Sequence, residues 1–171
     1  EVNYIRDKFN VISDDLLAKT DQLRFLAYND PLTRLPSKNR AVIDFDELIK
    51  SSESISFIYL DLKRFGVINE NFGFDFGDEI IKAISQRMLN KFEHFYRIDG
   101  DEFLILHTTD DKQSFNNTVS YVNKIFKKPI LLNGITLSVD YNIGVSNYPD
   151  DSTKFEDLLA YSVIAMQEAK Q

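Results

Sequence analysis

The chain has 171 residues, of which 43% are hydrophobic and 27% are charged, with a formal net charge of −7 and no cysteine. This length allows one domain with its own core and an appended helix. The acidic balance argues against a protein that binds nucleic-acid backbones, and the lack of cysteine excludes disulfides and thiolate chemistry. No apolar run approaches the roughly 20 residues of a membrane span, and no signal peptide is visible.

Residues 1–29 predict one long helix with a coiled-coil seam. Apolar residues recur at alternating spacings of three and four, interrupted only at Lys19. These are Val2, Ile5, Phe9, Ile12, Leu16, Leu23 and Leu26. This heptad pattern is typical of a coiled-coil dimer. Val11 and Leu17 widen the stripe, so a single amphipathic helix lying on the domain is the alternative. Asp30-Pro31 ends the helix, because the residue before proline is displaced from the α region.

The next stretch predicts a helix, a buried strand, a loop and a second helix. Ser37 is placed to cap a helix over residues 38–50. The apolar run from Ile55 to Leu62 predicts a largely buried strand with Asp61 near its C-terminal end. Residues 65–76 are expected to form a loop that carries Asn69, and residues 76–91 a helix with one apolar face.

The stretch Y-R-I-D-G-D-E-F-L-I-L, from Tyr96 to Leu106, predicts a β-hairpin. Asp99-Gly100 is a strong signal for a type I′ turn, which requires positive φ at both central residues. The second strand then begins with Asp101 and Glu102. If the Asp61 strand pairs beside this hairpin, three carboxylates come together, and a metal ion such as Mg²⁺ is their expected partner. On this stretch alone, a solvated turn with acidic residues is the alternative.

The last third of the chain completes the predicted fold. Residues 114–127 predict a helix that Pro129 stops. Strands over residues 130–132 and 135–145 are joined by Asn133-Gly134, a second type I′ candidate. Thr153 and Glu156 form a capping box at the start of a final helix. Strands interleaved with helices and tight hairpins indicate an α+β domain over residues 30–171, with a mostly antiparallel central sheet flanked by helices.

Several motifs occur in order between Asp30 and Lys170. They read D-P-L-T-R-L-P-S-K-N-R (30–40), L-D-L-K-R-F-G-V-I-N-E-N-F-G-F-D-F-G-D (60–78), R-I-D-G-D-E-F (97–103), S-V-D-Y-N-I-G-V-S-N-Y-P-D-D (138–151) and A-M-Q-E-A-K (165–170). The ordered set resembles the GGDEF family, the diguanylate cyclases and their degenerate relatives. The resemblance implies the nucleotidyl-cyclase-like palm fold of that family, here preceded by the helix of residues 1–29.

The resemblance also implies a catalytic metal site. In active relatives each domain holds one GTP with two Mg²⁺ ions. Two domains face each other so that each 3′-hydroxyl attacks the α-phosphate of the other GTP, which gives cyclic di-GMP and pyrophosphate. In this sequence Asp61, Asp101 and the Leu62 carbonyl match the ligands of Mg²⁺ or Mn²⁺. Glu102 matches the acidic position beside them and completes the catalytic set with Asp61 and Asp101.

Four further residues match nucleotide-binding positions of the family. Asn69 and Asp78 match the guanine-binding positions, where an amide and a carboxylate pair with the edge of the base. Gly100 matches a glycine that lets the backbone approach the nucleotide, and Lys170 matches a lysine that faces the phosphates. Two alternatives remain open. Asn69 could be a loop amide that bonds its own backbone, and Asp78 a charge favoured at a helix N-terminus.

Several positions depart from the family pattern. Asp99 stands where the family signature has a glycine, so it adds bulk and negative charge beside the phosphates. Gly66 replaces a lysine that contacts the phosphates. The other departures are Lys63 for aspartate, Phe74 for histidine, Ser162 for aspartate and Gln167 for tyrosine. The segment 90–93, N-K-F-E, lacks both ends of the Arg-x-x-Asp product-inhibition site, so feedback inhibition through it is not expected.

These features favour a regulatory module over an enzyme. The segments P-I-L-L-N-G, Y-P-D-D and A-M-Q-E-A-K resemble GGDEF domains that are followed by an EAL phosphodiesterase domain. We expect a GTP-binding regulatory domain of a bacterial cyclic di-GMP signalling protein, catalytically weak or inactive and homodimeric through residues 1–29. The alternatives are an active diguanylate cyclase and a dimerisation and relay domain that binds no nucleotide.

The ends of the chain suggest a longer protein. The sequence begins at Glu1 rather than Met and stops at Gln171 within a helical pattern. We therefore expect a fragment of a cytoplasmic protein, or of the cytoplasmic part of a membrane-bound one, with a sensory domain upstream and an EAL domain downstream.

Overall fold

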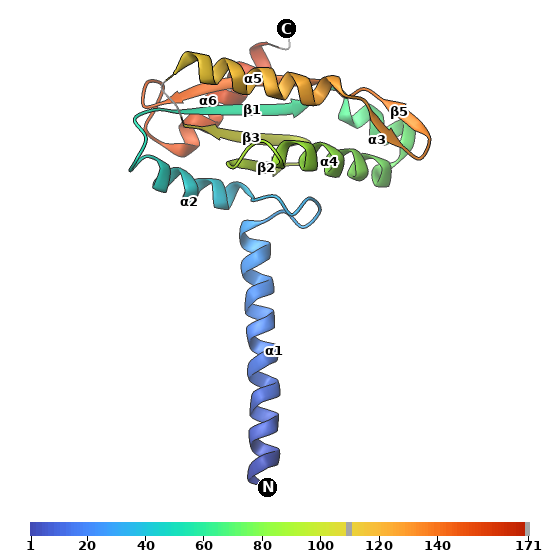
Figure 1. The fold of residues 1–171 in the computed structure, drawn as a ribbon, viewed down its shortest axis with the longest axis vertical. Helices are drawn as coiled ribbons and strands as arrows, with labels where there is room; N and C mark the ends of the chain where they lie inside the picture. Colours follow the sequence, from blue (N-terminus) through green and yellow to red (C-terminus); the bar gives the residue numbers. More distant parts are fainter. Residues whose placement is uncertain (109–110, 170–171) are drawn as a thin grey trace.

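The computed structural model describes residues 1–108 and 111–169, and it confirms the predicted α+β fold. A long helix extends away from a domain in which helices cover an antiparallel sheet (Figure 1). The elements are α1 (Val2–Tyr28), α2 (Lys38–Leu48), β1 (Ile55–Leu62), α3 (Phe65–Phe72), α4 (Phe74–Leu89), β2 (Phe95–Asp99), β3 (Glu102–His107), α5 (Lys112–Lys127), β4 (Ile130–Leu132), β5 (Ile135–Leu137), β6 (Tyr141–Tyr148) and α6 (Phe155–Glu168).

Helix α1 projects from the domain and does not lie on it (Figure 1). None of its residues is buried, and its apolar seam is exposed, with Phe9 68% and Leu16 64% accessible. The alternative of an amphipathic helix packed on the domain is therefore wrong, while pairing of the seam with a second chain stays a prediction. Over the residues that the structure describes, no helix combines the length and apolar character needed to span a bilayer.

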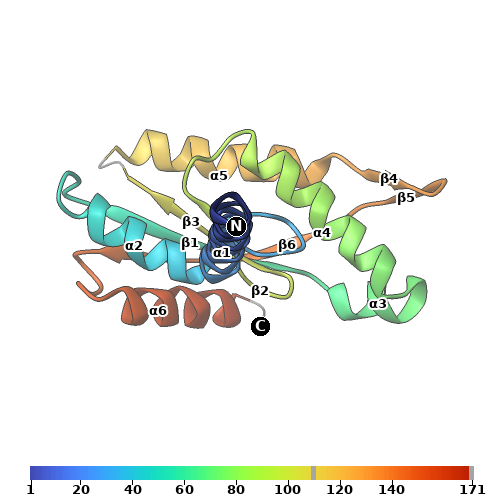
Figure 2. The same cartoon turned by 90° about the horizontal axis from the view of Figure 1, so that it is seen from below.

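The sheet has the strand order β2-β3-β1-β6, and every neighbouring pair is antiparallel. Helices α4 and α5 cover one face, and α2 and α6 cover the other (Figure 2). Because successive residues of a strand point to opposite faces, β1 supplies Leu60 and Leu62 to the first core and Phe57 and Tyr59 to the second. This double burial explains the nearly continuous apolar run of β1, which Asp61 interrupts close to the strand end.

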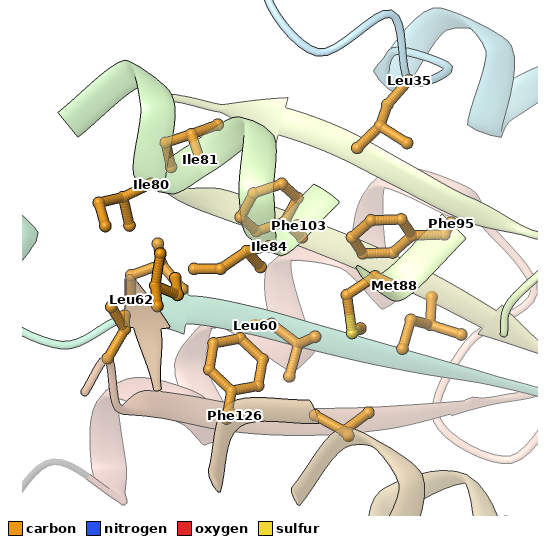
Figure 3. Packing of buried hydrophobic residues seen from close by; sticks show 14 of the residues in the cluster. Leu35, Leu60, Leu62, Ile80, Ile81, Ile84, Met88, Phe95, Phe103 and Phe126 are labelled. Atoms are coloured by element: carbon orange, nitrogen blue, oxygen red, sulfur yellow. The ribbon is translucent and has the colours of Figure 1, made fainter. Parts of the chain in front are cut away.

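Helix α4 contributes its apolar stripe to the core beneath it. Ile80, Ile84 and Met88, spaced four residues apart, face the sheet together (Figure 3). The rings of Phe95 in β2 and Phe103 in β3 stack in the same core with centroids 5.4 Å apart. These contacts fix the hairpin and α4 against each other.

Helix α6 lies directly on the backbone of β6. Gly144 has no room for a side chain, because a Cβ there would meet the backbone oxygen of Ser162 and the backbone nitrogen of Met166. The buried hydroxyl of Ser146, two residues along β6, donates to the Leu158 carbonyl at 2.6 Å. The glycine therefore allows the close approach of helix and strand.

Arg97 connects the base of α1 to the hairpin turn. Asp30 accepts hydrogen bonds from the backbone N–H and the hydroxyl of Thr33, each at 2.7 Å, and pairs with Arg97 at 2.8 Å. Arg97 also donates from Nε and a terminal nitrogen to the Gly100 carbonyl, at 3.0 and 2.7 Å. Burial alone would raise the pKa of the Asp30 carboxyl, but the hydrogen bonds from Thr33 and Arg97 hold that pKa below its usual value.

The predicted loop over residues 65–76 is wrong, because most of it is helical. Residues 65–72 form α3, and Gly73, with a φ of 87°, separates it from α4. Phe65 and Ile68 pack against the core, so tertiary contacts hold a short helix that the glycines of this stretch did not suggest. The strand predicted over residues 135–145 is also interrupted, since β5 ends at Leu137 and β6 begins at Tyr141.

Two local predictions of turn and cap chemistry need correction. The hairpin is present, but its two turn residues are Gly100 and Asp101, because β2 extends to Asp99, which pairs with Glu102. Of these residues only Gly100 has positive φ, at 39°, so the turn is not type I′. Asp101 consequently lies in the turn and not on the strand.

The capping predictions also fail in part. Helix α6 has Lys154 at its N-cap, and no side chain caps it, so the box of Thr153 and Glu156 does not form. The Ser152 hydroxyl takes part of that role, because it accepts from the Lys154 backbone N–H at 3.1 Å and donates to Asp157 at 3.0 Å. Ser37 does occupy the N-cap of α2, but its hydroxyl makes no capping bond.

We expect Gly144→Ala to destabilise the domain by about 1–3 kcal/mol, because the added methyl group would collide with the α6 backbone, which cannot rotate away as a side chain can. Gly66→Ala in α3 is the matched control, since nothing lies within 4 Å of its added carbon. Alanine is also the better helix former, so this control should be at least as stable as the wild type. Urea denaturation measures both variants. Equal stability of the two would contradict the close contact of α6 with β6.

The Asp30–Arg97 pair predicts a pH-dependent contribution to stability. A carboxyl whose pKa is lower in the folded state stabilises the fold above its unfolded pKa, here near 3.8, and loses that stabilisation as the pH falls through the folded pKa. We expect Asp30→Asn to cost about 1–3 kcal/mol at neutral pH and less at about pH 3. Asp46→Asn, exposed on α2, is the control and should change stability by less than about 0.5 kcal/mol. Denaturation at both pH values tests this, and an equal loss at both would contradict the ion pair.

Candidate nucleotide site

The register of β1 and β3 brings the predicted catalytic acids to one end of the sheet. Asp61 lies directly opposite Glu102, and Asp101 immediately precedes β3 in the turn. The backbone N–H of Leu62 donates to the Asp101 carbonyl at 3.2 Å, so the end of β1 and the turn are in contact. The prediction that Asp61 and the hairpin lie on adjacent antiparallel strands is confirmed.

Uncharged protein groups hydrogen-bond two of these acids. The amide of Asn142, opposite Asp61 on β6, donates to the Asp61 carboxylate at 3.1 Å. The hydroxyl of Tyr59, on the same face of β1, hydrogen-bonds Glu102. Burial of the phenol and its bond to Glu102 both raise the pKa of Tyr59, which keeps the proton on the donor. A metal ion is therefore not the only partner that can hold carboxylates here.

The three acids do not form a ready metal cluster. Among residues 1–108 and 111–169, no group of three or more His, Cys, Asp or Glu side chains is placed to hold a metal ion. The available donor set consists of Asp61, Asp101 and the Leu62 carbonyl, all oxygen ligands. This set fits Mg²⁺, which usually binds through one or two carboxylates and completes its shell with phosphate and water.

The two predicted guanine-binding residues lie on helices that meet at Gly73. Asn69, on α3, places its side chain against Gly77 of α4, and a Cβ on Gly77 would occupy the space of that amide. The Oδ1 atom of Asn69 is buried and has no hydrogen-bond partner among residues 1–108 and 111–169. The interpretation of Asn69 as a loop amide bonded to its own backbone is therefore wrong, because the residue is helical and this oxygen is unpaired.

Asp78 is exposed on the second turn of α4, beside the residue that contacts Asn69. The acidic residue in the first turn of this helix is Asp75. Since the macrodipole acts mainly within the first turn, it accounts for Asp75 better than for Asp78. An exposed carboxylate that follows Gly77, against which the buried Asn69 amide oxygen packs, is an arrangement that can receive the edge of a base.

The residues expected near the phosphates make different contacts in the structure. The Asp99 carboxylate accepts from the Gly100 N–H at 2.9 Å, so it caps its own turn. Gly66 is exposed on α3 with open space around it. Lys63 pairs with Asp140 at 3.0 Å, and the hydrogen bond from Lys63 lowers the pKa of the Asp140 carboxyl. Lys170 lies outside the described residues.

Sequence reasoning missed Tyr59 and Asn142 as partners of the acids. Tyr59 precedes Asp61 by two residues, so strand periodicity alone places it on the same face and could have identified it. Asn142 is 81 positions from Asp61, and only the pairing of β1 with β6 reveals their contact.

Comparisons with known proteins agree with this geometry. The family model described as "Diguanylate cyclase, GGDEF domain" matches residues 27–171. Signaling protein YkoW of Bacillus subtilis is 29% identical over 100% of the chain, which covers 23% of YkoW. Cyclic di-GMP phosphodiesterase NbdA of Pseudomonas aeruginosa is 30% identical over 95% of the chain, which covers 22% of NbdA. The chain thus spans about a quarter or less of the length of these relatives.

A solved structure matches both the domain and the projecting helix. The coiled coil and GGDEF domain of DgcB from Caulobacter crescentus, in complex with c-di-GMP, superposes with a TM-score of 0.81. The match covers 99% of this chain and 94% of that one, at 15% sequence identity. At this identity the likeness establishes the fold, including the arrangement of a long helix before the domain.

Proposed function

Because the chain belongs to the GGDEF family of diguanylate cyclase domains, we propose that it is a GTP-binding regulatory domain of a cyclic di-GMP signalling protein, with weak or absent cyclase activity. The observation that carries this proposal is the contrast between the two ends of the site. At the proposed guanine end, the Asn69 amide packs against Gly77, and the exposed Asp78 is the next residue of α4. The phosphate end has gained Asp99 and lost a lysine at Gly66.

The guanine end has the groups needed to select the base. A carboxylate at Asp78 accepts from the guanine N1–H and exocyclic amine, neither of which adenine presents in that arrangement. The Asn69 amide supplies a donor and an acceptor, and its buried Oδ1 gains a partner if the base binds. Pairing such a buried acceptor removes a penalty of about 1–3 kcal/mol. GTP should therefore bind in preference to ATP.

The phosphate end opposes turnover. A carboxylate about 4 Å from a phosphate charge costs roughly 4 kcal/mol at an effective dielectric near 20. Asp61, Asp101 and the Leu62 carbonyl would hold Mg²⁺, which when bound neutralises the triphosphate and the charge that develops in the displacement. Asn142 and Tyr59 hold Asp61 and Glu102 in place for this role. Asp99 adds negative charge beside the same phosphates, and Gly66 provides none of the compensating positive charge.

The proposal also includes the pairing of two chains and the domains of the full-length protein. The exposed seam of α1 supports a parallel pairing of residues 1–29 between two chains, with residues 30–171 as the GGDEF domain. NbdA is a cyclic di-GMP phosphodiesterase of which this chain covers 22%, which supports further domains beside this one in the full-length protein. We propose that these are an EAL domain downstream and a sensory domain upstream, in a cytoplasmic protein or the cytoplasmic part of a membrane-bound one.

An active diguanylate cyclase is the second candidate. The direct pairing of Asp61 with Glu102 favours it, because the acids of the family signature keep their place on adjacent strands. A dimerisation and relay domain that binds no nucleotide is a third candidate, favoured by the projecting α1. Titration with GTP and Mg²⁺ separates the third candidate from the others, and an assay for cyclic di-GMP separates the first two.

We expect calorimetry with Mg²⁺ to show tighter binding of GTP than of ATP, and Asp78→Ala to abolish this preference. Gly77→Ala should also weaken GTP binding, because its methyl group displaces the Asn69 amide. Gly66→Ala, with open space around the added carbon, is the matched control and should bind GTP as the wild type does. Equal affinity for GTP and ATP, or guanine selectivity that survives Asp78→Ala, would contradict the assignment.

We expect the wild type to produce cyclic di-GMP slowly or not at all, since Asp99 and Gly66 act in the same direction on the phosphates. The combined change Asp99→Gly and Gly66→Lys should tighten GTP binding, and the lysine side chain starts in open space because nothing lies within 4 Å of a Cβ at Gly66. A product assay and calorimetry test both statements. Turnover by the wild type at an ordinary enzyme rate of about 1 s⁻¹ or more would refute the proposal. Unchanged GTP affinity in the double variant would show that the phosphate contacts are not the defect.

A further inference from the structure

Phe74, the first residue of α4, presents its aromatic ring to solvent. It is 77% exposed, whereas its neighbours Phe72 and Phe76 stack on each other with centroids 4.8 Å apart. Phe76 is buried in the core, so the packing of this helix end does not depend on Phe74. A single exposed apolar residue needs no explanation by itself. The polar residues near Phe74 indicate what its exposed ring could contact.

Phe74 and Asp78 occupy one stripe of α4. They are four residues apart on the helix, a spacing that places two side chains next to each other on the surface, and both are exposed. Gly77, which adjoins Asp78, lies under the Asn69 amide from α3. Helices α3 and α4 adjoin each other (Figure 2), and the residues near Gly73 that join them include an aromatic ring, a carboxylate and an amide with a buried oxygen.

We propose that Phe74 stacks on the face of the guanine base whose edge Asp78 and Asn69 bind. A purine presents a polar edge and two flat aromatic faces. Edge contacts select guanine, and a stacked ring adds affinity without distinguishing one base from another. Phe74 is therefore a positioning and affinity residue, while Asp78 determines specificity. This inference rests on the proposed binding of GTP.

The stacking shifts recognition from the phosphates to the base. Asp99 repels the phosphate chain, and Gly66 offers no cation to it. The favourable contacts of this chain with a guanine nucleotide are then concentrated on the base, at Asn69, Phe74 and Asp78. The ligand class that fits is guanine nucleotides in general, so in the absence of Mg²⁺ GMP should bind about as tightly as GTP.

Calorimetry of the 171-residue chain with GTP, GMP and ATP tests the inference. Phe74→Ala should weaken GTP and GMP binding by a similar factor, roughly 10-fold, which lies within the range that stacking of one base on an aromatic side chain supplies. The ratio of GTP to ATP affinity should stay at its wild-type value. Phe74→Trp should bind GTP and GMP at least as tightly as the wild type does, because a larger ring stacks at least as well.

Leu131→Ala is the matched control, since Leu131 is 72% exposed on β4 and belongs to neither α3 nor α4. It should bind GTP as the wild type does. Wild-type GTP affinity in Phe74→Ala, an equal loss in Leu131→Ala, or binding of GTP without binding of GMP would each overturn the inference while the proposed GTP binding stands. A wild type that binds neither nucleotide would overturn the proposed function, and the inference with it.

Discussion

The arginine at position 97 fixes the geometry on which the rest of the site depends. Its side chain is largely buried, at 12% exposure, and its guanidinium donates hydrogen bonds to the Asp30 carboxylate and the Gly100 carbonyl. A guanidinium is a planar fork whose donors keep fixed directions. The hairpin turn is therefore held relative to the residues that end α1 as well as by its strand partners. Asp99 and Asp101, the acids beside Gly100, take their positions from this anchor.

The central strand explains how acids can stand at the edge of an apolar core. A strand buried on both faces accepts a charge only where suitable donors reach it. Asp61 meets that condition through Asn142 on one neighbouring strand, and Glu102 meets it through Tyr59. Asn142 and Tyr59 carry no charge. They therefore give the two carboxylates hydrogen-bond partners without neutralising the negative charge of the carboxylates. The protein thus holds Asp61 and Glu102 in position whether or not a metal is bound.

The sequence contained the fold class and most elements, because these depend on periodicity and on strong local signals. Successive side chains of β1 enter the cores on opposite faces of the sheet. Both sets must be apolar, and this gives the continuous apolar run by which the strand is identified. Predictions from short sequence motifs failed where contacts with distant segments of the chain determine the local structure. A register shift between Arg97 and Asp99 moves the turn by one residue, and Asp-Gly alone carries no sign of it. Helix α3 exists because Phe65 and Ile68 find a core supplied by other segments. The Asn142–Asp61 contact joins residues 81 positions apart, so no short motif could contain it.

The two ends of the proposed nucleotide site, the guanine end and the phosphate end, rest on different parts of the fold, and this separation bears on the proposed function. The guanine end is built by α3 and α4, two helices joined at Gly73 and held by the core. The phosphate end is built by the turn, where the Asp99 carboxylate bonds the Gly100 N–H. A substitution in the turn therefore alters the charge near the phosphates without moving Asn69 or Asp78. Catalysis requires both ends at once, since a displacement at phosphorus depends on charge neutralisation, whereas binding of a base requires only one. Under the proposed function, a chain with an acidic turn and intact helices is consequently better suited to hold a guanine nucleotide than to convert it.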